Sequence, residues 1–241
     1  MTRISTAMLL AAGLGTRMKP LTNTLPKPLI EVAGRTLLDR VLDKLVAQGV
    51  TRAVVNVHYL ADKIEAHLKS RKDIEIIISD ERDVLLETGG GVIKALPHLG
   101  QDPFFVVNTD VTWATAGDDT FARMAEAYDP NEMDALLLLA EMGATMGFRG
   151  PGDFFLGPEG QLMRRGDKPT APYVFAGTHI THADLLRGYE VKPFSANIYW
   201  NAMGRAGRLF GTVMKPFWLH VGDPQGRDEA EARLRTMGPG A

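Results

Sequence analysis

The feature that most constrains the fold is an alternation of short apolar runs with segments of helical periodicity between residues 8 and 108. The apolar runs are continuous, as in strands buried on both faces of a parallel sheet. Strands that alternate with helices favour crossover connections, and such sheets bind ligands beyond the carboxyl ends of their strands. We predict strands over Met8–Ala12, Ala53–Val57, Ile74–Ile78 and Phe104–Asn108, and helices over Thr36–Gln48, Ala61–Ser70 and Gly91–Leu96.

The second half of the chain is less regular. Its pattern predicts a helix over Asp119–Tyr128, a strand over Ala135–Ala140 and a closing helix over Glu229–Met237. Between these elements lies a stretch rich in Gly and Pro, in which Asp153–Leu156 and Gln161–Met163 are expected to pair as a hairpin. The whole pattern predicts an α/β protein.

Composition limits the classes of protein that this chain can represent. Of its 241 residues 45% are hydrophobic, and the net charge of -2 gives no basic excess for nucleic acid or an anionic membrane. The chain has no cysteine, which excludes disulfides, thiolate metal sites and a cysteine nucleophile. The apolar run Ala7–Ala12 is too short to span a membrane and lacks a signal-peptide pattern. We expect a cytoplasmic protein that binds neither nucleic acid nor membrane.

A glycine-rich loop, Gly13-Leu14-Gly15-Thr16-Arg17, follows the first predicted strand. Glycines let backbone N–H groups approach phosphate oxygens, and arginine adds a fork of donors suited to phosphate. The loop is neither a Walker loop nor a dinucleotide fingerprint, and an ordinary strand-to-helix turn would carry the same two glycines. Lys27 stands between two prolines on stiffened backbone that would position its amine, with a solvated surface lysine as the alternative.

The stretch Leu10–Leu29 resembles the signature of the sugar-phosphate nucleotidyltransferases. That signature reads Leu-Ala-Ala-Gly-x-Gly-Thr-Arg-Met/Leu, then Pro-Leu-Thr, then Pro-Lys-Pro-Leu, and every part is present in order. The resemblance implies a Rossmann-like nucleotidyltransferase fold with a mixed, mostly parallel central sheet and helices on both faces. It also implies catalytic roles for Arg17 and Lys27. The nucleotide-binding residues that it implies here are Leu10, Ala11, Ala12, Gly13, Gly15, Thr16, Arg17 and Lys27.

Leu85–Gly91 contains the segment Glu-Thr-Gly-Gly-Gly, which resembles a family segment that lines the base and the sugar ring. We therefore expect a backbone contact with the nucleotide from Gly89 or Gly90, with a flexible turn before a helix at Gly91 as the alternative. Glu81 lies upstream, where relatives often place a side chain that reads the base. A solvated loop position would also suit Glu81.

The predicted strand Phe104–Asn108 leads into Thr109 and Asp110. A carboxylate at the carboxyl end of a strand can hold Mg²⁺ beside a triphosphate, whereas an aspartate that caps the next turn is a common alternative. The resemblance makes Asp110 the principal metal ligand and a catalytic residue. It makes Asn108 a contact of the sugar.

The second half carries weaker matches to the family. Gly166-Asp167-Lys168-Pro169 resembles a Glu-Lys-Pro motif whose lysine binds the sugar phosphate, which implies Asp167 and Lys168 as contacts there. Gly177 lies in a strand where the family glycine lets the sugar approach the backbone.

Trp218–Pro224 resembles the family's closing motif, usually Asp-Val-Gly-Thr-Pro. His220 stands where the second metal aspartate is usual, and Mg²⁺ prefers oxygen ligands. Asp223 is then a candidate metal ligand, directly or through water, or else the cap of a following helix.

The resemblance implies an enzyme that transfers a nucleotidyl group to a sugar 1-phosphate by metal-assisted in-line displacement, with release of pyrophosphate. We expect one domain over residues 1–241, with a nucleotide-binding half to about residue 112, a sugar-phosphate-binding half beyond it, and no C-terminal hexapeptide-repeat domain. The short chain and the Glu-Thr-Gly-Gly-Gly segment favour the uridylyltransferases of N-acetylmuramate alpha-1-phosphate in peptidoglycan recycling, which implies UTP and Mg²⁺. Two alternatives stay open: a mannose-1-phosphate guanylyltransferase, and a non-catalytic regulatory subunit that senses a nucleotide-sugar.

Overall fold

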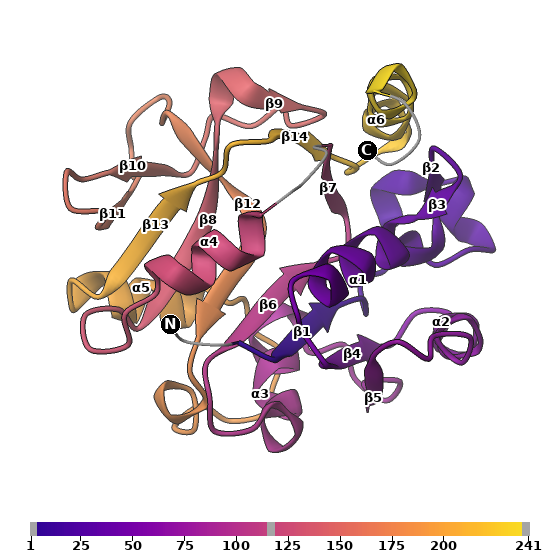
Figure 1. The fold of residues 1–241 in the computed structure, drawn as a ribbon, viewed down its shortest axis with the longest axis horizontal. Coiled ribbons are helices and arrows are strands. Elements are labelled where there is room, and N and C mark those ends of the chain that lie inside the picture. The colour runs from indigo at the N-terminus through magenta and orange to yellow at the C-terminus, as the bar shows by residue number, and fades with distance from the viewer. Residues whose placement is uncertain (1–3, 115–118, 238–241) are drawn as a thin grey trace.

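A central sheet dominates the computed structural model, which describes residues 4–114 and 119–237 (Figure 1). Its strands are β1 (Thr6–Leu10), β4 (Arg52–Val57), β5 (Glu75–Asp80), β6 (Phe104–Asn108), β8 (Ala135–Glu141), β10 (Phe154–Leu156), β11 (Leu162–Arg164), β12 (Tyr173–Thr181) and β13 (Leu209–Val213). The order is β11-β10-β12-β6-β1-β4-β5, and β8 joins β12 to β13. β6, β1, β4 and β5 run parallel, whereas β12 is antiparallel to β6.

The helices that the structure describes connect strands, except the last, which follows the final strand. They are α1 (Leu37–Ala47), α2 (Ala61–Leu68), α3 (Glu87–Leu99), α4 (Thr120–Ala127), α5 (Asn197–Arg205) and α6 (Pro224–Met237). Short 3₁₀ helices cover Thr16–Met18, Leu21–Asn23, Lys27–Leu29, Met142–Ala144 and Ala183–Leu185. Among the described residues, no helix combines the length and the apolar character that crossing a membrane requires.

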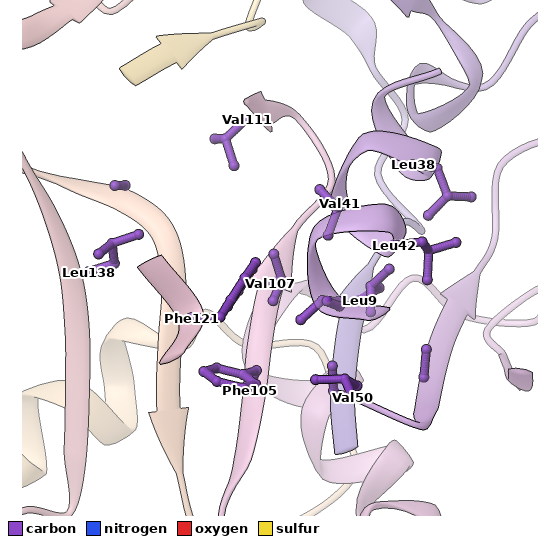
Figure 2. Packing of buried hydrophobic residues seen from close by; sticks show 14 of the residues in the cluster. Leu9, Leu38, Val41, Leu42, Val50, Phe105, Val107, Val111, Phe121 and Leu138 are labelled. Carbon is purple, nitrogen blue, oxygen red and sulfur yellow. The ribbon is translucent and has the colours of Figure 1, made fainter. Parts of the chain in front are cut away.

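Alternate residues of the central strands pack into separate apolar clusters. Leu9 and Val107 face a cluster with α1 and α4 (Figure 2). Met8 and Val106 face the opposite way, into a cluster with α3 and α5. Because side chains alternate along a strand, the continuous apolar runs bury both faces of the sheet. The predicted fold class, a mixed and mostly parallel sheet with helices on both faces, is confirmed.

The predicted elements exist, but some boundaries differ. β1 ends at Leu10, so Ala11 and Ala12 belong to the loop. α3 begins at Glu87 and not at Gly91, and α6 begins at Pro224 and not at Glu229. Both helices have glycine in their first turns. Because glycine has a low helix propensity, the sequence pattern does not indicate that these turns are helical. The hairpin forms as expected between β10 and β11.

Several short elements carried no periodic signal and were not predicted. They are α5, β13, β2 (Glu31–Val32), β3 (Arg35–Thr36), β7 (Val111–Ala114), β9 (Thr145–Met146) and β14 (Phe217–His220). β7, β14 and β9 form a second sheet, in which His220 pairs with Val111. The N–H of Val221 also donates to the carbonyl oxygen of Asp110 at 3.0 Å. This small sheet therefore brings the closing motif beside the end of β6.

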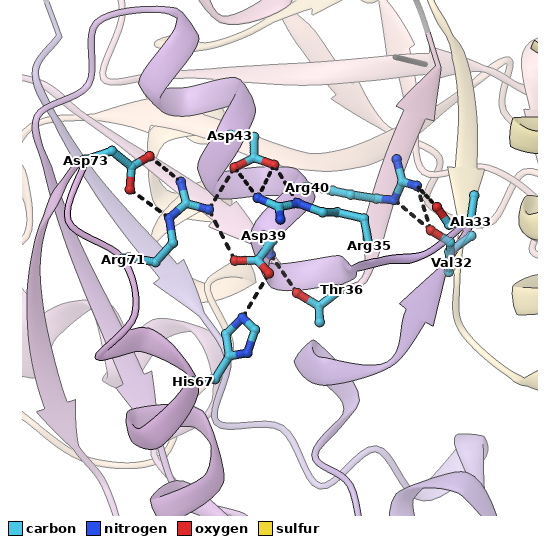
Figure 3. Close-up of polar contacts among 10 residues, drawn as sticks. All are labelled: Val32, Ala33, Arg35, Thr36, Asp39, Arg40, Asp43, His67, Arg71 and Asp73. Carbon is cyan, nitrogen blue, oxygen red and sulfur yellow. Dashed lines mark hydrogen bonds and ion pairs between the residues drawn. The ribbon is translucent and has the colours of Figure 1, made fainter. Parts of the chain in front are cut away.

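A polar network ties α1 to α2 and the segment that follows it (Figure 3). The Asp39 side chain, 8% exposed, lies 2.9 Å from His67 Nε2 and accepts a hydrogen bond from Arg71 Nη1 at 3.2 Å. Burial would raise the pKa of Asp39, but its hydrogen bond with the Thr36 side chain and the charges of His67 and Arg35 hold that pKa below its ordinary value.

Candidate active site

The carboxyl ends of β1, β4 and β6 border a cavity of about 410 Å³. Its walls come from the end of β1 and the loop after it, the lysine between two prolines, the end of β4, the start of α3, the end of β6 and one serine. The lining residues are Leu10, Ala11, Ala12, Gly13, Lys27, Pro28, Asn56, Leu85, Glu87, Thr88, Asn108, Thr109, Asp110 and Ser195. The fold thus brings motifs that are far apart in the sequence to one edge of the sheet, where ligands of such folds bind.

Lys27 and Asp110 form an ion pair inside this cavity. Lys27 Nζ lies 2.8 Å from Asp110 Oδ2, and the side chains are 13% and 26% exposed. His220 Nε2 lies 4.0 Å from the same oxygen. Burial would raise the pKa of Asp110, but the charges of Lys27, His220 and Arg17 together lower it below its ordinary value. The cavity therefore holds the Asp110 carboxylate in direct contact with the ammonium group of Lys27.

The glycine-rich loop folds tightly over the start of the site. Gly15 has a φ of +61°, and a Cβ there would lie 2.9 Å from Thr22 Cγ2 and 3.1 Å from Lys27 Cβ, so only glycine fits. The N–H groups of Gly13 and Leu14 make no hydrogen bond within residues 4–114 and 119–237. Such successive unpaired N–H groups are suited to an anion.

Thr16 and Arg17 lie outside the cavity lining, and both are exposed. Arg17 still acts on the site through its charge, which lowers the pKa of Asp110. The predicted contacts of Gly15, Thr16 and Arg17 with a triphosphate stay predictions.

Ala11 and Ala12 line the cavity, but their N–H groups are already bonded. Both donate to Asn56 Oδ1, at 2.7 and 3.2 Å. A ligand in the cavity can therefore contact only their side chains and carbonyl groups. The first N–H group of the loop that is unpaired among the described residues belongs to Gly13. Sequence reasoning missed Asn56, whose only signal is a polar residue inside the apolar run Ala53–Val57.

Glu81 is buried outside the cavity lining. This corrects both expectations for it, a contact with the base and a solvated position in a loop. The residue is 1% exposed and accepts hydrogen bonds from Asn56 Nδ2 at 2.7 Å and from the N–H of Leu86 at 3.0 Å. Neither a base contact nor a solvated loop position agrees with this burial.

Gly89 and Gly90 are in contact with another segment of the chain. They lie in the first turn of α3, and their N–H groups both donate to the carbonyl oxygen of Phe194, at 2.8 and 3.2 Å. A Cβ on Gly90 would collide with the carbonyl oxygen of Lys192. The glycines therefore admit the backbone of residues 192–194, and their N–H groups are already bonded; the expected backbone contact with the nucleotide stays a prediction.

Other lining residues at this wall were not proposed as site residues. Glu87 is exposed and has a φ of +59°, unusual for a residue with a side chain. The N–H of Ala196 donates to Thr88 Oγ1 at 2.9 Å, and Ser195 reaches the cavity from the same segment. Glu87 and Thr88 belonged to the motif Glu-Thr-Gly-Gly-Gly, whereas nothing in the sequence marked Ser195.

The residues predicted to bind the sugar phosphate, apart from Asn108, lie outside the cavity lining. Asp167 and Lys168 are exposed, and Lys168 Nζ lies 4.3 Å from the ring centroid of Phe155. Gly177 is buried with a φ of +83°, and a Cβ there would lie 2.9 Å from Val111 Cγ2 and 3.3 Å from Asn108 Cβ. Gly177 therefore makes room for the turn that carries Asn108, which corrects the expectation of an open approach for the sugar.

Of the two polar residues in the closing motif, His220 lies near Asp110, whereas Asp223 caps the following helix. Asp223 Oδ1 accepts a hydrogen bond from the N–H of Gly226 at 2.7 Å, as the cap of a helix does, and its role as a metal ligand stays a prediction. His220 packs against Trp218 with 5.4 Å between ring centroids and an interplanar angle of 23°.

The donor set suits a metal that arrives with its own ligands. Within the described ranges, no group of three or more His, Asp or Glu side chains is arranged to hold a metal ion. Asp110 offers one hard carboxylate oxygen, and Mg²⁺ commonly takes only one or two protein carboxylates, with phosphate and water oxygens as its other ligands. The residues present therefore fit a Mg²⁺ ion delivered by a triphosphate.

Comparisons with known proteins agree with this geometry. Residues 7–183 match the MobA-like NTP transferase domain. The chain is 46% identical to the N-acetylmuramate alpha-1-phosphate uridylyltransferase of Caulobacter vibrioides, over 95% of this chain and 96% of that protein. It is 36% identical to the protein of the same name from Neisseria meningitidis serogroup B, over 94% of this chain and 96% of the other.

The fold also recurs in solved structures. A putative glucose-1-phosphate thymidylyltransferase from Bacillus anthracis, crystallised with a sucrose, superposes with a TM-score of 0.78 over 98% of this chain and 97% of that one. Its sequence identity of 17% makes this a likeness of fold alone. Taken with the match over residues 7–183 and the two relatives above, the chain belongs to the MobA-like NTP transferase family, among its sugar-phosphate nucleotidyltransferases.

Proposed function

We propose that this chain is a uridylyltransferase that joins UTP to N-acetylmuramate alpha-1-phosphate and releases pyrophosphate. The observation that carries the class of reaction is one cavity that holds the Lys27–Asp110 pair and Gly13, whose N–H group, like that of the neighbouring Leu14, is unpaired among the described residues. The choice of UTP and of this sugar follows the two relatives of that name.

In this proposal an oxygen of the sugar phosphate attacks the alpha-phosphorus of the triphosphate in line. A bond from that phosphorus to the sugar phosphate forms, and its bond to the pyrophosphate oxygen breaks. Gly13 and Leu14 bind phosphate oxygens through their N–H groups, and Lys27 and Arg17 neutralise the charge that grows on the leaving pyrophosphate. When Mg²⁺ is bound through Asp110, it supplies further neutralisation of the phosphate charge.

We further propose a single domain whose halves meet at about residue 112, the first for the nucleotide and the second for the sugar phosphate. Asp167 and Lys168 remain candidates for the sugar phosphate, because both residues are exposed. A role in peptidoglycan recycling in the cytoplasm follows from the proposed product.

Pyrophosphate release from a matrix of substrates tests the proposal. UTP, GTP and dTTP are each combined with N-acetylmuramate, N-acetylglucosamine, glucose and mannose 1-phosphates, and kcat/KM is measured for every pair. We expect the highest value for UTP with N-acetylmuramate 1-phosphate. A clear preference for GTP with mannose 1-phosphate would replace this proposal by the guanylyltransferase.

A further inference from the structure

A buried chain of hydrogen bonds joins two walls of the cavity. It starts at the N–H groups of Ala11 and Ala12, which donate to Asn56 Oδ1 at 2.7 and 3.2 Å. Asn56 Nδ2 then donates to Glu81 Oε1 at 2.7 Å, and Glu81 Oε2 accepts from the N–H of Leu86 at 3.0 Å. Leu86 directly precedes α3, whose first residues form the opposite wall. The chain of bonds therefore connects the loop after β1 to the start of α3.

The chemistry of Glu81 fixes the orientation of Asn56. A carboxylate only accepts hydrogen bonds, so the side of the Asn56 amide that faces Glu81 must be its NH₂ group. The carbonyl oxygen of the amide then points at Ala11 and Ala12, which need an acceptor. Asn56 and Glu81 are 2% and 1% exposed, so breaking a bond between them leaves largely buried polar groups unpaired.

Gly91 leaves the space that this arrangement needs. A Cβ on Gly91 would lie 2.8 Å from Asn56 Nδ2 and 2.8 Å from Glu81 Oε1. Both distances are too short for a carbon atom, so any side chain on Gly91 would push the two polar groups apart. The last glycine of the Glu-Thr-Gly-Gly-Gly motif thus faces the bonded pair and not a ligand.

We propose that Asn56 and Glu81 are positioning residues that hold the phosphate-binding loop in place. Their hydrogen bonds reach as far as Ala12. The unpaired N–H groups of Gly13 and Leu14 belong to the next two residues of the sequence. Fixing Ala11 and Ala12 therefore fixes where those N–H groups stand relative to Lys27 and Asp110. This inference rests on the proposed function for its effect on turnover, but the hydrogen bonds can be tested without it.

The isosteric variant Glu81→Gln tests the orientation directly. An amide has one acceptor and one donor, so Gln can satisfy either Asn56 Nδ2 or the N–H of Leu86, but not both. We expect Glu81→Gln and Asn56→Ala to raise the KM for UTP at least about tenfold, since small displacements of binding groups have effects of this size. The KM for the sugar phosphate should change by less than about twofold, because the series of hydrogen bonds holds the loop after β1, which is proposed to bind the nucleotide.

A double variant provides the rescue. In Asn56→Asp with Glu81→Gln, the Asp accepts from Ala11, Ala12 and the Gln NH₂ group, and the Gln oxygen accepts from Leu86. Every bond is restored and the net charge is unchanged, whereas Asn56→Asp alone sets two carboxylates against each other. We expect the double variant to recover a KM for UTP close to that of the wild type.

Thr181→Val is the matched control. It removes one partly buried hydrogen bond, from Thr181 Oγ1 to the carbonyl oxygen of Asp134 at 2.9 Å, beside the opposite end of β6. The unfolding midpoint of every variant is measured with its kinetics. The inference is overturned if Glu81→Gln shifts the KM for UTP no more than Thr181→Val does, or if the folded double variant fails to restore it.

Amide hydrogen exchange by NMR separates this inference from the proposed function. The Ala11 and Ala12 amides should be protected in the wild type and the double variant, and should exchange at least about tenfold faster in Glu81→Gln. If the wild type releases no pyrophosphate with any substrate pair, the proposed function fails and exchange alone decides. Equal protection in the wild type and Glu81→Gln would overturn the positioning role.

Discussion

Replacing Lys27 with methionine removes the ammonium group while keeping most of the side chain's apolar length. In the structure that ammonium lies 2.8 Å from Asp110 Oδ2, and both side chains are largely buried, at 13% and 26% exposure. The substitution therefore has two separable effects. It removes a cation from the proposed triphosphate site, and it leaves a partly buried carboxylate without its ion-pair partner.

The two effects differ in size. Charges 2.8 Å apart attract by about 6 kcal/mol at an effective dielectric constant of about 20, but desolvation offsets most of this. Because the pair is neither fully buried nor exposed, we expect Lys27→Met to lower the free energy of unfolding by about 1 to 3 kcal/mol. Loss of a preorganised contact with the growing charge should raise the barrier by about 3 kcal/mol, so kcat/KM should fall by about a hundredfold or more.

Pyrophosphate release and urea unfolding measure the two effects on the same preparations. Lys72→Met is the control, since Lys72 is an exposed lysine in the segment after α2 and lies outside the cavity lining. It should leave both quantities nearly unchanged. If Lys27→Met is folded and keeps near-normal kcat/KM, the triphosphate binds elsewhere and the assignment of this cavity is wrong.

Three further predictions concern the metal site, the Asp39 network and the stereochemistry of the transfer. Asp110→Asn should abolish Mg²⁺-dependent turnover, whereas His220→Ala should reduce turnover less. His220→Asp should keep activity at lower Mg²⁺ concentrations. Mg²⁺ titrations that give the reverse order of effects would overturn the metal assignment. Asp39→Asn should cost about 2 kcal/mol of unfolding free energy at pH 7, because its acceptor oxygens face His67 and Arg71. The folded-state pKa of Asp39 lies below its ordinary value of 3.8, so this contribution is full above that value and disappears as the pH falls through the lower folded value. Urea unfolding at pH 7 and pH 3 should show the gap between wild type and variant shrinking, and an equal gap at both would contradict it. Finally, a chiral alpha-phosphorus should be inverted in the product, whereas net retention would exclude direct displacement.

Most strands of the central sheet, and Lys27 and Asp110 as candidate site residues, could be predicted because local signals mark them. Apolar runs reveal buried strands, and Lys27 and Asp110 sit in motifs at the ends of such runs. The role of Asn56 could not be predicted, because its partners lie 45 and 25 positions away along the chain.

The partner of Gly89 and Gly90 could not be predicted for a similar reason. Glycines next to a predicted helix indicate that something approaches the backbone closely, but they do not identify what approaches. Here it is the carbonyl oxygen of Phe194, which the fold brings from the far half of the chain. For Asp223 the sequence allows both a helix cap and a metal ligand; the structure shows the cap contact with the Gly226 N–H, and the metal-ligand role stays a prediction.

The most direct test of the proposed function is ³¹P NMR of the purified protein with UTP, N-acetylmuramate alpha-1-phosphate and Mg²⁺. We predict that the nucleotide-sugar and pyrophosphate appear in equal amounts, and that neither forms when one substrate is left out. If the protein binds the nucleotide or the nucleotide-sugar but forms no product from any triphosphate and sugar 1-phosphate pair, it is a binding protein and not a transferase.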